Sequence, residues 1–191
     1  MKFKMTEIVE QAAQIIMNSG IENLTVKNLA KKMVVDEDEL SLLFSNDDHI
    51  LLLIFENFEK ELKEFILELS RNNDPPEKEF KTFFKHLYNL FLQKPFYLSI
   101  IFDKGLKNRD ERIKKSIIRM KDIVENYLTQ LINIGKLHNS FKTKKPTRVL
   151  VGRMLVEFRM LMRDEQYLNE MILQMNTLKD PAGKILKDQK S

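Results

Sequence analysis

Apolar residues recur at the i, i+3, i+4 spacing of helices along most of the chain, and only five Gly and five Pro residues interrupt them. Abundant Leu, Ile, Lys and Glu favour the same interpretation. The pattern predicts an all-α protein of about nine helices, at residues 6–19, 26–33, 37–44, 50–69, 78–93, 96–107, 110–134, 147–163 and 167–178.

Turn and capping residues set the predicted boundaries. Gly20 ends the first helix, Thr25 caps the second, and Gly135 ends the long seventh helix. Pro75 and Pro76 mark the clearest loop, because one proline stops a helix and the other can open the next.

The predicted helices form two groups. Three short helices occupy the first fifty residues and a long helix follows them, as in a helix-turn-helix head on a helical body. We therefore expect a head at residues 1–48 and a body at residues 49–191. With 43% hydrophobic residues, a chain of 191 residues can build a core for both.

Composition excludes several classes of protein. The chain has no Cys, so it has no disulfide framework, thiolate nucleophile or zinc-thiolate site. Its most apolar run, residues 50–55, is much shorter than a membrane span, and the N-terminus lacks the apolar stretch of a signal peptide. We expect a cytoplasmic protein that does not bind membranes.

The formal net charge of +4 is unevenly distributed. Residues 1–50 hold five Lys and nine Asp or Glu, a net charge of −4, whereas the rest of the chain carries +8. The basic excess lies outside the predicted head, so the overall charge is a poor argument for nucleic-acid binding.

The most unusual segment is residues 36–48, DEDELSLLFSNDD, which has six carboxylates and no basic residue. Leu40, Leu43 and Phe44 have helical spacing, which predicts a short helix with these three side chains in the core. Asp36 can cap this helix, and Glu39 three residues later completes a capping box.

Residues 8–51 resemble the helix-turn-helix head of the tetracycline-repressor (TetR) family of transcriptional regulators. The spacing of the shared residues agrees without a gap: Ile15, Ile16, Gly20, Thr25, Leu29, Ala30 and Phe44. The resemblance implies a dimeric DNA-binding regulator. In such proteins a small ligand bound in the helical body changes the separation of the two heads and so shifts DNA affinity.

The departures from the family pattern concern DNA contacts. The family commonly has Gly, Thr, Tyr and Lys where this chain has Val34, Glu39, Ser41 and Asp47. The Tyr and Lys positions typically hold DNA phosphates, which position the protein without reading sequence. Ser41 retains a hydrogen-bond donor, whereas Asp47 would repel a phosphate.

The predicted DNA contacts combine the few bases of the head with polar side chains of the third helix. Glu37 or Glu39 can accept a hydrogen bond from a cytosine amino group if lysines elsewhere hold the phosphates. The full set is Lys4, Thr25, Lys27, Lys31, Lys32, Glu37, Asp38, Glu39, Ser41 and Leu42.

Three roles for the acidic helix remain open at this point. It is a capped and solvated face, a reader of bases, or a surface that recruits a basic protein. The last role gives an alternative function, a dimeric ligand- or partner-binding protein with the TetR fold whose head has lost direct DNA binding.

Aromatic side chains recur at helical spacing between residues 80 and 97. They predict either a plain core or a pocket for a small apolar or amphipathic ligand. The candidate pocket residues are Phe84, Tyr88, Phe91, Phe102 and Tyr127.

Residues 148–162 are apolar around most of the helix circumference, which indicates burial against more than one neighbour. The resemblance implies a homodimer formed by the last two helices, and the alternative is that they close a monomeric core. The predicted interface residues are Val151, Gly152, Leu155, Phe158, Met162, Met171 and Met175.

Catalysis is not expected. His49, His86 and His138 are far apart and lack metal-ligand spacing. The sequence has no Gly-rich phosphate loop and no Gly-x-Ser-x-Gly motif. We expect neither a metal nor a cofactor.

Overall fold

The computed structural model describes residues 4–162, and within this range every regular element is a helix, as the sequence predicts. The helix predicted at 167–178 lies outside the described residues. The described elements are α1 (Met5–Ser19), the 3-10 turn η1 (Ile21–Asn23), α2 (Val26–Met33), α3 (Glu37–Ser41), α4 (Asp47–Arg71), α5 (Pro76–Gln93), α6 (Phe96–Phe102), α7 (Leu106–Arg109), α8 (Glu111–Leu137) and α9 (Thr147–Leu161).

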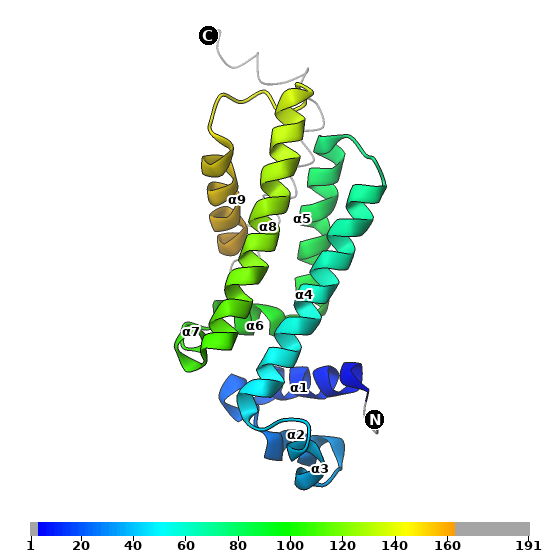
Figure 1. The fold of residues 1–191 in the computed structure, drawn as a ribbon, viewed down its shortest axis with the longest axis vertical. Helices are drawn as coiled ribbons and strands as arrows, with labels where there is room; N and C mark the ends of the chain where they lie inside the picture. Colours follow the sequence, from blue (N-terminus) through cyan, green and yellow to red (C-terminus); the bar gives the residue numbers. More distant parts are fainter. Residues whose placement is uncertain (1–3, 163–191) are drawn as a thin grey trace, which may run out of the picture.

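The described part of the molecule is elongated, with the small head at one end (Figure 1). Helices α1, α2 and α3 form the head, and α4 runs from it into the body alongside α5 and α8. Helix α9 packs against α8. Helix α6 lies between the body and the head and contacts α1, so α4 is not the only body element that meets the head.

The head has its own apolar centre, built from one face of each short helix. Ile8, Leu29 and Leu40 are fully buried, and Phe44 is nearly so. Leu43, predicted to join them, is 37% exposed. Helix α3 ends at Ser41 and the chain turns at the next two residues, so helical spacing no longer places residue 43 on the buried face.

The body core is rich in aromatic rings. Phe55 of α4, Phe83 of α5 and Tyr97 of α6 are fully buried and belong to one continuous apolar cluster with the head residues. The Tyr97 hydroxyl accepts a hydrogen bond from Asn57 Nδ2 at 2.9 Å, so the buried polar atom has a partner. Burial raises the pKa of Tyr97, which therefore stays protonated.

The helix predicted at 96–107 is two helices, because Asp103 closes a turn between them. Its Oδ1 atom accepts from the backbone N–H groups of Gly105 at 2.7 Å and Leu106 at 3.0 Å. A short Asp side chain bonded to the backbone in this way competes with the helix and ends α6 at Phe102.

Gly135 does not end the long helix, which continues to Leu137. Its role is to admit a neighbour: a Cβ atom at this position would lie 2.1 Å from Cδ2 of Phe141. The chain folds back after α8, and the Gly135 carbonyl accepts from the N–H groups of Ser140 and Phe141. The glycine thus lets the Phe141 ring lie directly against the helix.

Candidate nucleic-acid interface and ligand site

Two side chains cap the start of α2. Thr25 Oγ1 accepts from the N–H of Asn28 at 3.1 Å, as the sequence predicts. Asp47, the first residue of α4, accepts from the N–H of Val26 at 2.7 Å. The positive end of the α2 dipole therefore faces a carboxylate of this chain.

This contact changes the interpretation of Asp47. The sequence predicts a charge that repels DNA phosphates, whereas the structure gives the half-buried carboxylate a partner inside the head. Its effect on DNA is reduced because the N-terminus of α2 compensates part of the charge. Asp47 therefore stabilises the contact between α2 and α4, whether or not it also affects DNA binding.

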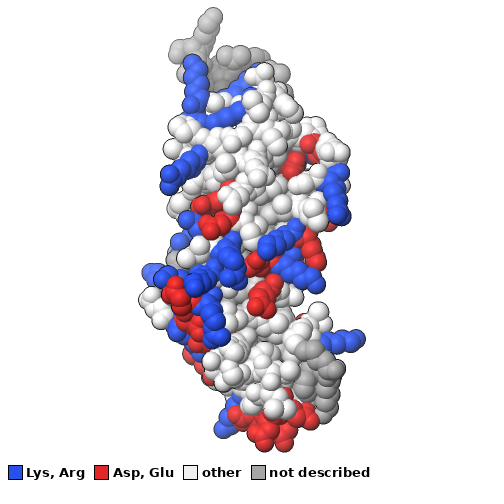
Figure 2. Space-filling view, viewed as in Figure 1, with Lys and Arg blue, Asp and Glu red and all other residues white. Residues whose placement is uncertain are grey.

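The acidic helix α3 projects at the tip of the head. Asp36 caps this helix, and its Oδ1 accepts from the N–H of Asp38 at 3.0 Å. The predicted capping box would use the N–H of Glu39, one residue later. Glu37 and Asp38 are exposed, and Figure 2 shows acidic side chains gathered at this end of the molecule. Glu39 is half-buried.

Two apolar side chains of the head are almost completely exposed. Val34 is 90% exposed and Leu42 is 88% exposed. Val34 also has φ 57° and ψ 47°, the left-handed conformation that a β-branched residue adopts only at a cost. It stands in the turn where the TetR pattern commonly has Gly.

The predicted DNA contacts lie at the head surface with two exceptions. Thr25 and Glu39 are half-buried, and the hydroxyl of Thr25 is engaged as a cap. The exposed members are Lys4, which precedes α1, the α2 lysines Lys27, Lys31 and Lys32, and the α3 residues Glu37, Asp38, Ser41 and Leu42.

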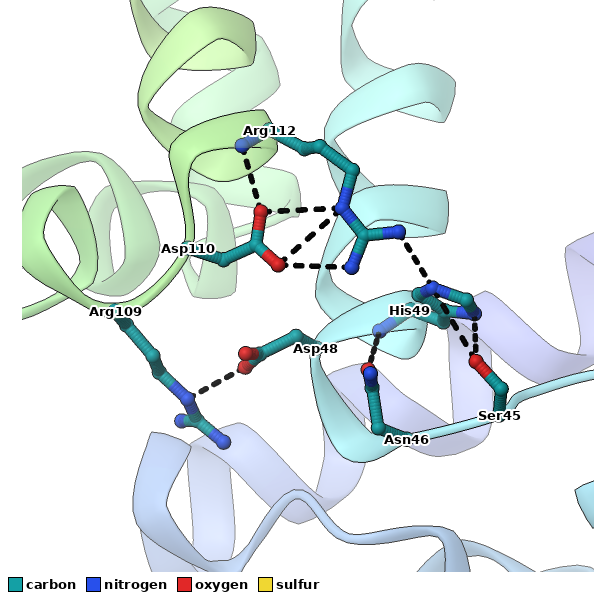
Figure 3. Close-up of polar contacts among 7 residues, drawn as sticks. All are labelled: Ser45, Asn46, Asp48, His49, Arg109, Asp110 and Arg112. Atoms are coloured by element: carbon teal, nitrogen blue, oxygen red, sulfur yellow. Dashed lines mark hydrogen bonds and ion pairs between the residues drawn. The ribbon is translucent and has the colours of Figure 1, made fainter.

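A polar cluster joins the start of α4 to the start of α8 (Figure 3). Arg112 donates to Asp110 at 2.8 Å and lies 2.7 Å from Nε2 of His49. A guanidinium can only donate, so His49 Nε2 is the acceptor and its Nδ1–H faces the Ser45 hydroxyl at 3.1 Å. Hydrogen bonds from Arg112 lower the pKa of Asp110 to about 2.

An ion pair runs parallel to this cluster. Arg109, at the end of α7, contacts Asp48 in the first turn of α4 at 2.5 Å. The Arg109–Asp48 pair is partly exposed, so it contributes about 1 kcal/mol or less to stability. Together the cluster and this pair connect the α7–α8 region of the body to the segment of α4 that enters the head.

The predicted aromatic pocket is largely filled by its own side chains. Phe84 and Phe91 are buried, and the Phe158 ring of α9 lies 5.5 Å and 6.1 Å from theirs. Tyr88 is half-buried, and so is Phe102, whose ring contacts the Arg159 guanidinium. These rings pack as core, which was one of the two interpretations of the aromatic pattern.

A cavity of about 570 Å³ lies elsewhere, at the end of the body remote from the head. It is bounded by the α4–α5 connection, the first turn of α5 and the C-terminal half of α8. Tyr127 is the predicted ligand-binding residue that lines it. Its hydroxyl donates to Glu79 at 2.8 Å.

The predicted dimer residues divide between the two faces of α9. Val151 is 3% exposed and Phe158 packs on α5, so both serve the core of their own chain. Leu155 and Met162 are half-buried in the same apolar cluster. The outer face carries exposed Val149, Gly152, Val156 and Met160. Met171 and Met175 lie outside the described residues.

Metal-binding clusters and membrane-spanning helices are both absent from residues 4–162. No group of three or more His, Asp or Glu side chains there is arranged to hold a metal ion. Among the same residues, no helix combines the length and apolar character that crossing a membrane requires.

Head and body together define a helix-turn-helix protein with a larger all-α domain. No protein-family model matches the sequence, and a search of curated proteins finds no relative. Solved structures share the fold: a TetR regulator from Legionella pneumophila has 11% identity and a TM-score of 0.74, over 93% of this chain and 99% of that one. The protein therefore has the TetR-family fold.

Two other structures match along nearly the whole chain. The MbdR regulator from Azoarcus sp. CIB shares 20% identity over 93% of this chain and 96% of its own, with a TM-score of 0.73. FadR from Bacillus subtilis, solved in complex with stearoyl-CoA, shares 14% identity over 92% and 95%, with a TM-score of 0.71. Such identities establish a common fold.

Proposed function

We propose that the protein is a transcriptional regulator that binds double-stranded DNA through its head and is controlled by a small ligand bound in its body. The observation that carries the proposal is the helix-turn-helix pair α2–α3, which presents exposed polar side chains at the end of the molecule. The same whole-chain fold in proteins described as transcriptional regulators supports it.

The electrostatics of the head are compatible with weak, salt-sensitive binding. Lys27, Lys31 and Lys32 are exposed on α2 and can meet phosphates. Asp47 repels DNA phosphates less than its charge suggests, because its carboxylate accepts a hydrogen bond from the Val26 N–H at the N-terminus of α2. Two heads of a dimer would double the number of contacts.

Control by a ligand requires a structural connection between the body and the head. Two sets of contacts can provide this connection. Helix α6 packs against α1, and Arg112 joins the start of α8 to His49 of α4. A ligand that favours one arrangement of these contacts changes DNA affinity by its differential binding, typically 1–3 kcal/mol. The stearoyl-CoA in the FadR structure supports a ligand with an apolar portion.

The dimer is also part of the proposal. The outer face of α9 presents Val149, Val156 and Met160 to solvent, and no described residue lies within 4 Å of a Cβ atom placed on Gly152 between them. A second copy of α9 could approach closely at the glycine, which suits a two-fold interface.

Fluorescence anisotropy tests DNA binding directly. The probe is the DNA upstream of the protein's own gene, titrated at 50, 100 and 200 mM salt. We expect saturable binding, and Lys31→Ala with Lys32→Ala should weaken it about tenfold and lower the salt slope by about two. Lys121→Ala, which removes an exposed lysine of α8 in the body, is the control and should leave DNA binding unchanged.

Equal effects of the head and body lysines would contradict the proposal, and so would an absence of binding at 50 mM salt. The second result would favour the other candidate, a partner-binding protein with the same fold. The observation behind that candidate is the exposure of Val34 and Leu42 beside the carboxylates of Glu37 and Asp38. It predicts that Glu37→Gln with Asp38→Asn leaves DNA binding absent.

A further inference from the structure

The cavity at the remote end of the body has the size of a small-molecule site. Its volume of about 570 Å³ falls in the usual range for such sites, about 300–1,000 Å³. It is open to solvent on one side, so a ligand can enter without a rearrangement of the core. Its walls come from three segments that are far apart in the sequence, the ends of α4 and α8 and the start of α5.

The lining is acidic. Asp74 and Glu79 both line the cavity, whereas neither Lys nor Arg does so among the described residues. Asp74 is paired with Lys78 at 2.8 Å, which compensates much of its charge. Among the described residues no base pairs with Glu79, which therefore carries most of the negative charge that a ligand would meet.

Glu79 is held in place by a buried hydroxyl. Tyr127 is 7% exposed, and its O–H donates to Glu79 Oε1 at 2.8 Å. Burial and the neighbouring carboxylate raise the pKa of Tyr127, so the phenol keeps its proton and remains the donor. A carboxylate accepts up to about four hydrogen bonds, so Glu79 retains capacity for a ligand.

The remaining walls include apolar surface. Leu131 and Ile134 of α8 line the cavity, together with Pro75 before α5 and Pro76, its first residue. The Ile134 side chain is 46% exposed. Covering it with hydrocarbon would remove apolar surface from water.

We propose that this cavity binds a small amphiphilic amine, whose ammonium group pairs with Glu79 and whose short hydrocarbon chain covers the exposed side chain of Ile134. The negative charge of Glu79 favours a cationic ligand over an anionic or neutral one. The apolar wall favours a cation with a hydrocarbon chain over a fully polar cation. The site lies at the end of α4 opposite the head, so this proposal holds whether or not the head binds DNA.

NMR titration with n-hexylammonium chloride tests the site. The protein contains four tyrosines, and ring-¹³C-tyrosine labelling with a Tyr127→Phe spectrum assigns the Tyr127 signal. We expect saturable shifts at Tyr127 at millimolar concentrations or below. Hexanoate and hexanol, of matched chain length, should bind at least tenfold more weakly.

Glu79→Gln is the informative variant, because the amide keeps an acceptor for Tyr127 and removes the charge. It should weaken n-hexylammonium binding at least tenfold, while the circular dichroism spectrum stays unchanged. Glu77→Gln, an exposed position on the same helix outside the cavity, should keep the affinity within twofold. Equal binding of hexanoate, an unchanged affinity of Glu79→Gln, or no Tyr127 shift at 10 mM n-hexylammonium would each overturn the proposal.

Discussion

Replacing Gly135 by alanine tests how the chain folds back from α8. A Cβ atom there would lie 2.1 Å from Cδ2 and 2.3 Å from Cε2 of Phe141, whereas carbon atoms in contact are about 3.5–4.0 Å apart. The ring must therefore retreat by more than about 1 Å and give up part of its edge contact with Phe80, which now has ring centroids 5.9 Å apart.

Two opposing effects set the magnitude for Gly135→Ala. Alanine is better than glycine inside a helix by about 1 kcal/mol. Overpacking against a ring that belongs to the apolar cluster costs about 1–3 kcal/mol. We expect a net loss of up to about 2 kcal/mol in the free energy of unfolding, measured by urea denaturation.

A double-mutant cycle separates the two effects. In a Phe141→Ala background the clash is absent, so the same Gly135→Ala change should stabilise the protein by about 1 kcal/mol. The change of sign is the prediction, with a coupling energy of about 1–3 kcal/mol. The same effect of Gly135→Ala in both backgrounds would show that the ring does not lie against the glycine.

Single substitutions at four other positions test further features of the structure. Val34→Gly should raise the free energy of unfolding by about 0.5–1 kcal/mol in urea denaturation, because it relieves the left-handed strain of a β-branched residue; a loss would contradict that strain. Asp47→Ala should destabilise the protein by about 1–2 kcal/mol in the same assay, whereas Asp47→Asn, which keeps an acceptor for the Val26 N–H, should cost less than half as much. Burial lowers the pKa of His86 in the folded protein. As pH falls below about 6.5, the unfolded chain therefore binds a proton at this position before the folded protein does, and the free energy of unfolding decreases. The difference between the urea midpoints at pH 7.5 and pH 5.5 should be smaller in His86→Gln than in the original protein. Gly152→Leu should convert the proposed dimer to a monomer in light scattering with unchanged helicity, and an unchanged mass would exclude this face of α9 from the proposed interface.

Capping residues and helical spacing predicted most helices and the core of the head, because these signals act between residues that are close in the sequence. Thr25 caps α2 within one turn, and the i, i+3, i+4 pattern placed Ile8, Leu29 and Leu40 in the core. One error arose where a side chain bonds to the backbone nearby. Asp103 splits one predicted helix, and its residue type was the available signal.

The contacts that define the candidate sites lie beyond the reach of sequence periodicity. Asp47 bonds to a backbone 21 residues earlier, Arg112 reaches His49 across 63 residues, and Tyr127 reaches Glu79 across 48. Such pairs depend on how the helices cross, which one sequence does not specify. The aromatic pattern had the same limit, because rings that line a pocket and rings that fill a core share helical spacing.

The cap formed by Asp47 also decides how small an autonomous head can be. A fragment that stops at Asn46 would leave the first N–H of α2 without its carboxylate partner. It would also lack Ile50, Leu51 and Ile54, which are fully buried. The shortest stable head fragment should therefore include the first turns of α4, and a truncation series should recover a cooperative thermal transition only when the chain reaches about Phe55.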